Sequence, residues 1–193
     1  MSTFLRRQLW PAFAILLALT VVTGVIYPAV VYAIGQVAFP SQANGSLIVV
    51  DGRTVGSSLI GQAFSDPTYF WGRPSAAGAE GYDANGSAGS NLGPTSQALI
   101  ERVTADVDAW RAAHGDAPVP VDLITTSASG LDPHISPAAA AYQVARVAAA
   151  RGMTEADIRA AVERNTEGPI LGFLGQARVN VLELNLDLDG ALR

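Results

Sequence analysis

A long, mostly apolar segment near the N-terminus constrains this chain more than any other feature. No charged residue occurs between Arg7 and Asp51, and residues 12–35 read AFAILLALTVVTGVIYPAVVYAIG. As a helix rising about 1.5 Å per residue, this run is about 36 Å long, enough to cross a hydrocarbon core of about 30 Å. The segment therefore predicts one transmembrane helix over residues 10–36, after a short cytoplasmic N-terminus of residues 1–9.

The residues that flank the segment predict its orientation. Arg6 and Arg7 are the only charges before it, so the N-terminus is expected to stay in the cytoplasm. The alternative is a cleaved signal peptide, for which residues 31–33 offer a weak cleavage site, but such peptides have apolar regions of about 7–15 residues. We favour an uncleaved single-pass anchor in a bacterial inner membrane, with residues 37–193 as an extracytoplasmic domain.

One part of the span carries small and polar residues rather than bulky aliphatic ones. These are Thr20, Thr23, Gly24, Tyr27 and Pro28. Small residues let membrane helices approach closely, and Thr can hydrogen-bond across the contact. We expect this set to contact a partner helix, although Gly and Pro are also more frequent in ordinary transmembrane helices.

The composition excludes several classes of chemistry. All 12 basic residues are Arg, because the chain has no Lys, and it has no Cys and only two His. There is thus no Walker A phosphate loop, no Schiff-base lysine and no thiol nucleophile, disulfide or thiolate metal site. Two His do not complete a His-rich metal centre, and a net charge of −5 gives no support for nucleic-acid binding. We expect no catalytic residue, no metal ligand and no nucleic-acid partner.

The rest of the chain predicts a mixed α/β (α+β) domain. Two short runs, residues 47–50 and 53–55, flank Asp51-Gly52 and predict a β-hairpin. Residues 63–94 are rich in Gly, Ser and Pro and predict a long loop, either a functional surface or simply a flexible one. Its aromatic run, residues 69–71, favours order, because three adjacent aromatic side chains are poorly placed in water.

Helices and strands are predicted to follow that loop. Three helices are expected, over residues 95–114, over 137–151 behind an N-cap at Ser136, and from an N-cap at Thr154. A strand is expected over residues 121–125. At the C-terminus, leucines at every second position of residues 182–189 predict a strand with one buried face.

One cluster has residue types found in hydrolases. Ser127, Ser129, Asp132 and His134 bring hydroxyls, a carboxylate and an imidazole close together in sequence. Triad members are held in line by the fold and usually come from separate segments, and there is no G-x-S-x-G elbow. We interpret the cluster as a turn leading into a helix. A membrane-anchored exported Ser-type hydrolase and a pilin-like structural protein are the alternative functions, although pilin helices usually carry an early Glu that this span lacks.

The motifs taken together resemble the C subunit of the Kdp-type potassium-transporting ATPase (the KdpC family). The matching blocks are Thr23-Gly24, Tyr27-Pro28, residues 43–47 (ANGSL), 56–64 (GSSLIGQAF), 69–76 (YFWGRPSA), 89–92 (GSNL), 127–132 (SASGLD) with Ile135, 137–140 (PAAA), Gln143, 146–148 (RVA), Arg151 and 179–186 (VNVLELNL). They run in order along nearly the whole chain. Gln176-Ala177, in the turn before the last block, departs from the acidic residue and proline of the family pattern.

The resemblance implies a role in a complex. Such subunits accompany a channel-like potassium-binding subunit, a P-type ATPase subunit and a small membrane peptide in the lipid bilayer, and the complex imports K⁺ at the expense of ATP. The C subunit is not the ATPase; it is expected to assist assembly and, as a catalytic chaperone, to raise the ATP affinity of the subunit that binds ATP. The family proposal of nucleotide contact falls here on Ser58, Gly61 and Gln62. It conflicts with the predicted orientation, which places these residues outside the cytoplasm, so we favour a structural and allosteric role.

Overall fold

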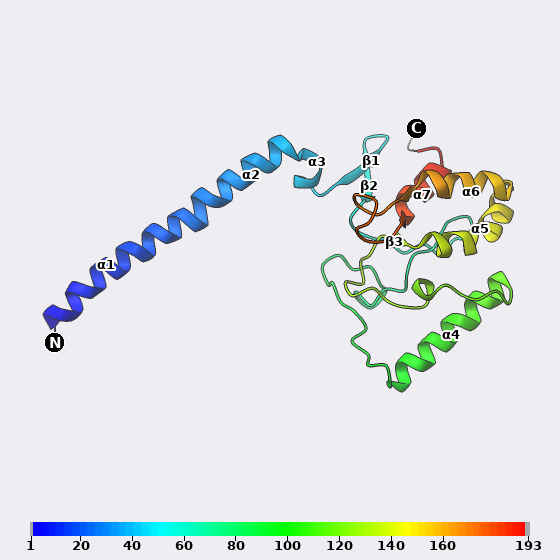
Figure 1. Cartoon of the computed structure of the whole chain (residues 1–193), viewed down its shortest axis with the longest axis horizontal. Coiled ribbons are helices and arrows are strands. Elements are labelled where there is room, and N and C mark those ends of the chain that lie inside the picture. Colours follow the sequence, from blue (N-terminus) through cyan, green and yellow to red (C-terminus); the bar gives the residue numbers. More distant parts are fainter. Residues whose placement is uncertain (1, 192–193) are drawn as a thin grey trace. The chain divides into compact units, whose positions relative to one another are not determined.

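The computed structural model describes the backbone of residues 2–191 and the side chains of residues 7–191 (Figure 1). By its internal contacts the chain divides into two compact units, Met1–Leu47 and Ile48–Arg193. Division by contacts does not test membrane-crossing bounds, so the extracytoplasmic domain of residues 37–193 stays a prediction. The two units are described separately below.

The first unit is helical throughout most of its length. Helix α1 (Ser2–Val21) continues through a π-helical segment (Val22–Ile26) into α2 (Tyr27–Ala38), and the one-turn helix α3 (Pro40–Ala43) follows. The stretch Arg7–Ala38 contains an 18-residue window with a mean hydropathy of 2.3, and none of the stretch is buried. It is long and apolar enough to cross a bilayer, and it suggests a membrane anchor.

The second unit starts with the predicted hairpin. Strands β1 (Leu47–Val50) and β2 (Arg53–Ser57) pair with each other. Between them, Asp51 and Gly52 have φ values of 49° and 76°. Two consecutive positive φ values are typical of a type I′ turn, which matches the twist of paired strands. The sequence prediction of the hairpin is confirmed.

The core of this unit consists of helices α5 (Pro137–Arg151), α6 (Glu155–Arg164) and α7 (Val181–Leu188) with a small sheet, and helix α4 (Gln97–His114) packs against it. Helices α5 and α6 pack together, α6 packs on α7, and α4 packs on α5 (Figure 1). Strands β3 (His134–Ile135), β5 (Arg178–Asn180) and β4 (Thr166–Glu167) form an antiparallel sheet in that order. The core residues Phe70, Val144, Ile158, Val179 and Leu184 are all fully buried.

The predicted N-caps of α5 and α6 and the predicted end of α5 agree with the structure. The Ser136 hydroxyl accepts from the Ala139 N–H at 3.0 Å, and the Thr154 hydroxyl accepts from the Asp157 N–H at 3.2 Å. Gly152 ends α5 in the left-handed conformation, with φ 64°. Side-chain caps of this kind satisfy backbone N–H groups that the first turn leaves free. The first predicted helix is confirmed as α4, which begins at Gln97 rather than residue 95.

Two predicted strands are wrong. Residues 121–125 contain a 3-10 turn, Val121–Leu123, which buries Leu123. Residues 182–189 lie mainly in helix α7, because the Asn180 side chain caps the Glu183 N–H at 3.2 Å and starts a helix. Leucines at every second position also include pairs four residues apart, so the alternation fits a helical stripe as well.

The long loop is present and ordered by its contacts. Within the described chain, residues 61–96 contain no helix or strand. Phe70 and Ala77 are nevertheless fully buried, and the Ser75 hydroxyl donates to the Gly130 carbonyl at 2.6 Å. Gly130 has φ 67°, and a Cβ there would overlap the Ala88 carbonyl oxygen. The loop therefore lies tightly against the turn of residues 127–133.

Candidate functional site

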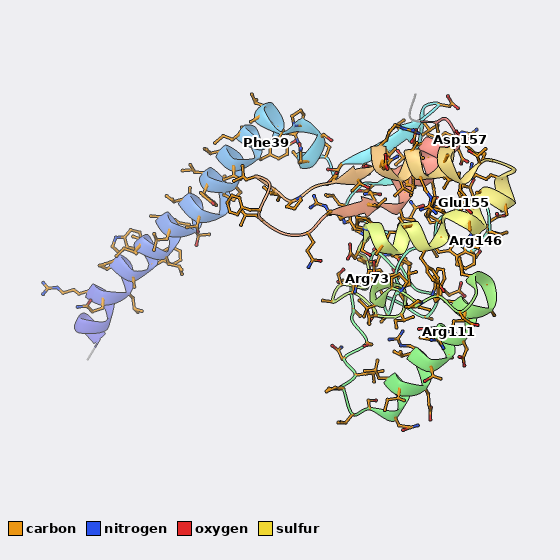
Figure 2. The ribbon with its side chains drawn as sticks, turned by 45° about the vertical axis from the view of Figure 1, so that its right-hand side comes forward. Phe39, Arg73, Arg111, Arg146, Glu155 and Asp157 are labelled. Atoms are coloured by element: carbon orange, nitrogen blue, oxygen red, sulfur yellow. The ribbon has the colours of Figure 1, made fainter. Side chains whose placement is uncertain are left out.

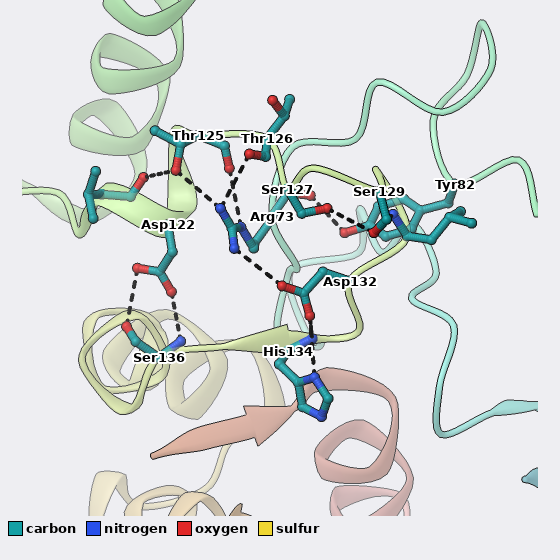
Figure 3. A network of polar contacts seen from close by, with 12 residues as sticks. Arg73, Tyr82, Asp122, Thr125, Thr126, Ser127, Ser129, Asp132, His134 and Ser136 are labelled. Carbon is teal, nitrogen blue, oxygen red and sulfur yellow. Dashed lines mark hydrogen bonds and ion pairs between the residues drawn. The ribbon is translucent and has the colours of Figure 1, made fainter. Parts of the chain in front are cut away.

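An ion pair ties the long loop to the turn before β3. Arg73 lies 3.2 Å from Asp132, from Nη1 to Oδ2. The same guanidinium donates to the Thr125 carbonyl at 3.3 Å and to the Thr126 carbonyl at 3.3 Å (Figure 3). This one arginine therefore joins the long loop to residues 125–132 through several hydrogen bonds.

Asp132 also binds His134. Its Oδ1 accepts from the His134 backbone N–H at 3.0 Å and lies 3.3 Å from the ring Nδ1 (Figure 3). Burial by itself would raise the pKa of Asp132, but the hydrogen bonds from His134 and the charges of His134 and Arg73 outweigh it and lower the pKa below its usual value. Asp132 is thus held as a carboxylate between a guanidinium and an imidazole.

The two serines of the turn are not joined to that imidazole. The Ser127 and Ser129 hydroxyls lie 3.4 Å from each other, and Ser129 Oγ accepts from the Leu131 N–H at 3.1 Å. Among the described residues, no hydrogen bond links either hydroxyl to His134. A Ser-His-Asp mechanism needs the imidazole beside the serine it deprotonates. The observed contacts are those of a turn, as the sequence predicted.

A second carboxylate positions the helix after the turn. Asp122 accepts from the Ser136 N–H at 2.7 Å and from the Ser136 hydroxyl at 3.1 Å (Figure 3). Ser136 is also the N-cap of α5. The 3-10 turn at 121–123 therefore connects directly to the start of the central helix, which explains why this segment is not a strand.

Two open pockets flank the Arg73–Asp132 ion pair. The first, of about 420 Å³, extends to Asp122, His134 and Arg178. The second, of about 540 Å³, extends to residues 59–60 and 127–133. The cations that line the first are already paired, since Arg178 lies 2.6 Å from Glu167. In the described part of the chain, no group of three or more His, Asp or Glu side chains is placed to hold a metal ion.

The predicted nucleotide-contact residues join the hairpin to the core. Gln62 donates from Nε2 to the Val55 carbonyl at 2.9 Å, and the Ser58 carbonyl accepts from Asn180 Nδ2 at 2.8 Å. The Gly61 N–H donates to the Leu131 carbonyl at 2.9 Å. These bonds account for part of the polar capacity of Ser58, Gly61 and Gln62 without a ligand. Nucleotide contact at these residues stays a prediction.

The predicted partner-contact residues of the apolar helix surround the π-helical segment. Thr23 and Gly24 lie inside Val22–Ile26, and the Tyr27 N–H donates to the Val22 carbonyl, five residues back. Thr20 precedes the segment, Pro28 follows it, and the Thr23 hydroxyl donates to the Leu19 carbonyl at 2.7 Å. π-Bulges occur mostly as single turns and often at functional sites. A partner helix at these residues stays a prediction.

A second polar cluster was not predicted from the sequence. Arg146 of α5 donates to His114 Nε2 at 3.0 Å and to the carbonyls of Pro67 and Tyr69 at 2.6 and 3.0 Å. Its guanidinium lies 3.8 Å above the centre of the Trp71 ring. Figure 2 shows Arg146 reaching from α5 toward α4. Burial lowers the pKa of Arg146 to about 10.

His114 is held as a neutral ring in this cluster. Because Nε2 accepts from Arg146, we assign the ring proton to Nδ1, which lies 3.1 Å from the Trp110 carbonyl oxygen. Burial lowers the pKa of His114; the contact with the Trp110 carbonyl opposes this shift and the Arg146 charge adds to it. The imidazole thus acts as a fixed acceptor for the guanidinium.

Comparison with known proteins identifies the family. The family model described as KdpC, K⁺-transporting ATPase, c chain, matches residues 9–190. The chain belongs to the KdpC family. It is 62% identical over 186 residues to the potassium-transporting ATPase KdpC subunit of Sorangium cellulosum, covering 95% of this chain and 98% of the relative. It is 56% identical over 191 residues to that of Dechloromonas aromatica (98% of each chain) and 53% identical over 186 residues to that of Koribacter versatilis (96% of each).

Several blocks that carried the family resemblance serve as internal ties in this KdpC chain. Arg73 and Asp132 form the central ion pair, and Gln143 and Arg146 hold the aromatic part of the loop. One signal for the last pair is present in the sequence. A Gln and an Arg three residues apart interrupt an alanine-rich helix, and such neighbours lie on one face.

Proposed function

We propose that this chain is a non-catalytic accessory subunit of an ATP-driven potassium uptake complex. In this proposal it assembles with a channel-like potassium-binding subunit, a P-type ATPase subunit and a small membrane peptide. K⁺ is the transported ion, and ATP is bound mainly by the ATPase subunit. Membership of the KdpC family carries the proposal.

The site geometry supports an accessory role over a hydrolytic one. The candidate hydrolase residues Ser127, Ser129 and His134 make contacts within their own turn, without a serine–imidazole hydrogen bond among the described residues. A subunit that works by positioning others needs a rigid body and a means of staying near them. The hydrogen-bonded loop supports the first requirement, and the apolar helix Arg7–Ala38 supports the second.

We further propose that the chain raises the ATP affinity of the ATPase subunit indirectly. In this proposal the N-terminus lies in the cytoplasm and residues 37–193 lie outside it, because Arg6 and Arg7 precede the apolar run. ATP would then be absent from the side where Gln62 lies. The effect on ATP affinity must therefore act through a conformational equilibrium of the partner.

A kinetic comparison tests the proposed role. The ATPase is purified with and without this chain, and K⁺-stimulated ATP hydrolysis is measured over a range of ATP concentrations. We expect the chain to lower the apparent KM for ATP several-fold and to change kcat less. Equal KM values in the two preparations would contradict the chaperone role.

Protease accessibility tests the orientation separately. Protease is added to intact spheroplasts that carry the chain with a C-terminal epitope tag. We expect digestion beyond residue 45 without lysis. Protection until the cells are lysed would place the domain in the cytoplasm and favour direct nucleotide contact at Ser58, Gly61 and Gln62. In that case Gln62→Ala should weaken nucleotide binding.

A further inference from the structure

The connection between β4 and β5 exposes four large apolar side chains. The exposed fractions are 60% for Ile170, 79% for Leu171, 73% for Phe173 and 50% for Leu174. We call residues 170–174 the apolar tip. Figure 2 shows this connection, between the orange and salmon strands, extending away from the helices of its unit. Exposed apolar groups gathered on one loop usually mark an interaction site.

The apolar tip is a hydrogen-bonded structure rather than a loose loop. Ile170 and Leu174 exchange two backbone hydrogen bonds, each 2.9 Å long. The Gly172 N–H donates to the Pro169 carbonyl at 3.0 Å. Leu171 has φ 55°, in the left-handed region that a leucine rarely adopts. A strained residue held this way presents its side chain to solvent in a fixed geometry, which lowers the entropy lost on binding.

The base of the tip is rigidly connected to the core. Glu167 and Arg178 pair across β4 and β5, and their side chains form an ion pair of 2.6 Å. The next residues of β5, Val179 and Asn180, are buried. A partner that holds the tip would therefore also hold the sheet and the start of α7.

The charge of the unit argues against a lipid surface as the occupant. Residues 48–193 carry ten Arg against 17 Asp and Glu, without Lys. Such a unit gains no electrostatic attraction to anionic lipids, and interfacial anchors usually combine an apolar face with Lys and Arg. Residues 168–177 (GPILGFLGQA) contain neither Lys nor Arg. An uncharged tip on an acidic body fits an apolar groove in a protein, where the core of an interface is depleted of charge.

We propose that the apolar tip docks in an apolar groove of another subunit of the same potassium-transporting ATPase. This inference rests on the proposed function as an assembly subunit. The chain belongs to a family of ATPase subunits, so partners are present in the same complex. Phe173 and Leu171, the most exposed members of the tip, are its anchors.

Photo-crosslinking tests the contact directly. The chain has no Cys, so Leu171→Cys creates one labelling site. The full chain is purified in mild detergent, labelled with a benzophenone maleimide, and added to ATPase assembled without it. Val121→Cys is the control, because Val121 is also exposed (68%) but lies outside the tip. We expect illumination to join residue 171 to another ATPase subunit, with at least several-fold less product from residue 121.

A second variant measures the contribution of the tip to assembly. Leu171→Ser combined with Phe173→Ser should weaken retention of this chain by the ATPase about tenfold or more. Its melting temperature should match wild type, because both side chains are exposed. Retention equal to wild type, crosslinks only to lipid or to a second copy of this chain, or equal products from both Cys variants would overturn the inference. If the unmodified chain is not retained by the ATPase, the proposed function fails as well.

Discussion

Asn185 is the residue whose removal should destabilise the domain most clearly. Its side chain is buried, with Oδ1 accepting from the Phe70 N–H at 2.8 Å and Nδ2 donating to the Phe70 carbonyl at 3.0 Å. Phe70 itself is fully buried in an irregular segment. One amide side chain therefore replaces the backbone partner that a neighbouring strand would supply.

The expected magnitude follows from those two hydrogen bonds. Asn185→Ala leaves the N–H and the carbonyl of Phe70 buried without a partner, and each such group costs about 1–3 kcal/mol. The sum is about 2–6 kcal/mol, against a typical domain stability of about 5–15 kcal/mol. A water molecule that enters the vacated space would reduce the loss toward the lower value.

Urea denaturation of the full chain in mild detergent measures this loss. The midpoint should fall while the slope m stays constant, since the unfolded state is unchanged. Gln97→Ala is the control, because that amide is exposed and, among the described residues, bonds only the nearby Glu101. We expect a change within about 0.5 kcal/mol. If Asn185→Ala also loses less than about 0.5 kcal/mol, Phe70 does not depend on this amide and the reasoning is refuted.

Three further predictions concern pH, the membrane helix and catalysis. The pKa of His114 is lower in the folded chain than in the unfolded chain, so the unfolded chain takes up a proton on this imidazole first as the pH falls through about 6.5. The free energy of unfolding should therefore decrease from pH 7 to 5. His114→Gln should flatten the dependence of the urea midpoint on pH in this range. A Cβ added at Gly24 meets no atom within 4 Å beyond the neighbouring helix backbone. Gly24→Leu should therefore still insert, while its retention in the ATPase under graded detergent weakens, by about 1–3 kcal/mol. Leu16→Ile is its control, and retention equal to wild type would place Gly24 against lipid. Ser127→Ala and His134→Ala should leave turnover unchanged in complexes that assemble normally, and a loss of several orders of magnitude would contradict the turn interpretation.

Local signals in the sequence account for the elements that were predicted correctly. The Asp51-Gly52 turn acts through the positive φ values of its two residues. The N-caps Ser136 and Thr154 each act through a hydrogen bond to the residue three positions on. Such contacts depend on nearby residues alone, so a pattern can reveal them. The alternating leucines after Asn180 failed as a predictor because they fit a strand and a helix equally well. The cap at Asn180 decided between the two.

Local patterns mark some of the residues that hold the long loop, but they do not show what those residues contact. Gln143 accepts from the Trp71 N–H at 2.9 Å and donates to the Trp71 carbonyl at 3.0 Å, across 72 positions of sequence. Neither residue type specifies such a contact. It exists because α5 packs beside the loop, and packing depends on the whole fold.

The two buried amides explain how a segment without strands can form part of the core. Asn185 of α7 and Gln143 of α5 bind the backbone of consecutive residues, Phe70 and Trp71, from two different helices. Arg146 then satisfies the carbonyl of Tyr69 at 3.0 Å. Since a buried backbone group without a partner is costly, these three side chains let Phe70 lie fully buried, with Tyr69 and Trp71 half-buried beside it. The same helices thus stabilise the loop that positions Arg73. We infer that removing any one of these three side chains should loosen the whole loop. The backbone of one residue of the aromatic run would then lose its side-chain partner, and the two residues beside it would be held less firmly.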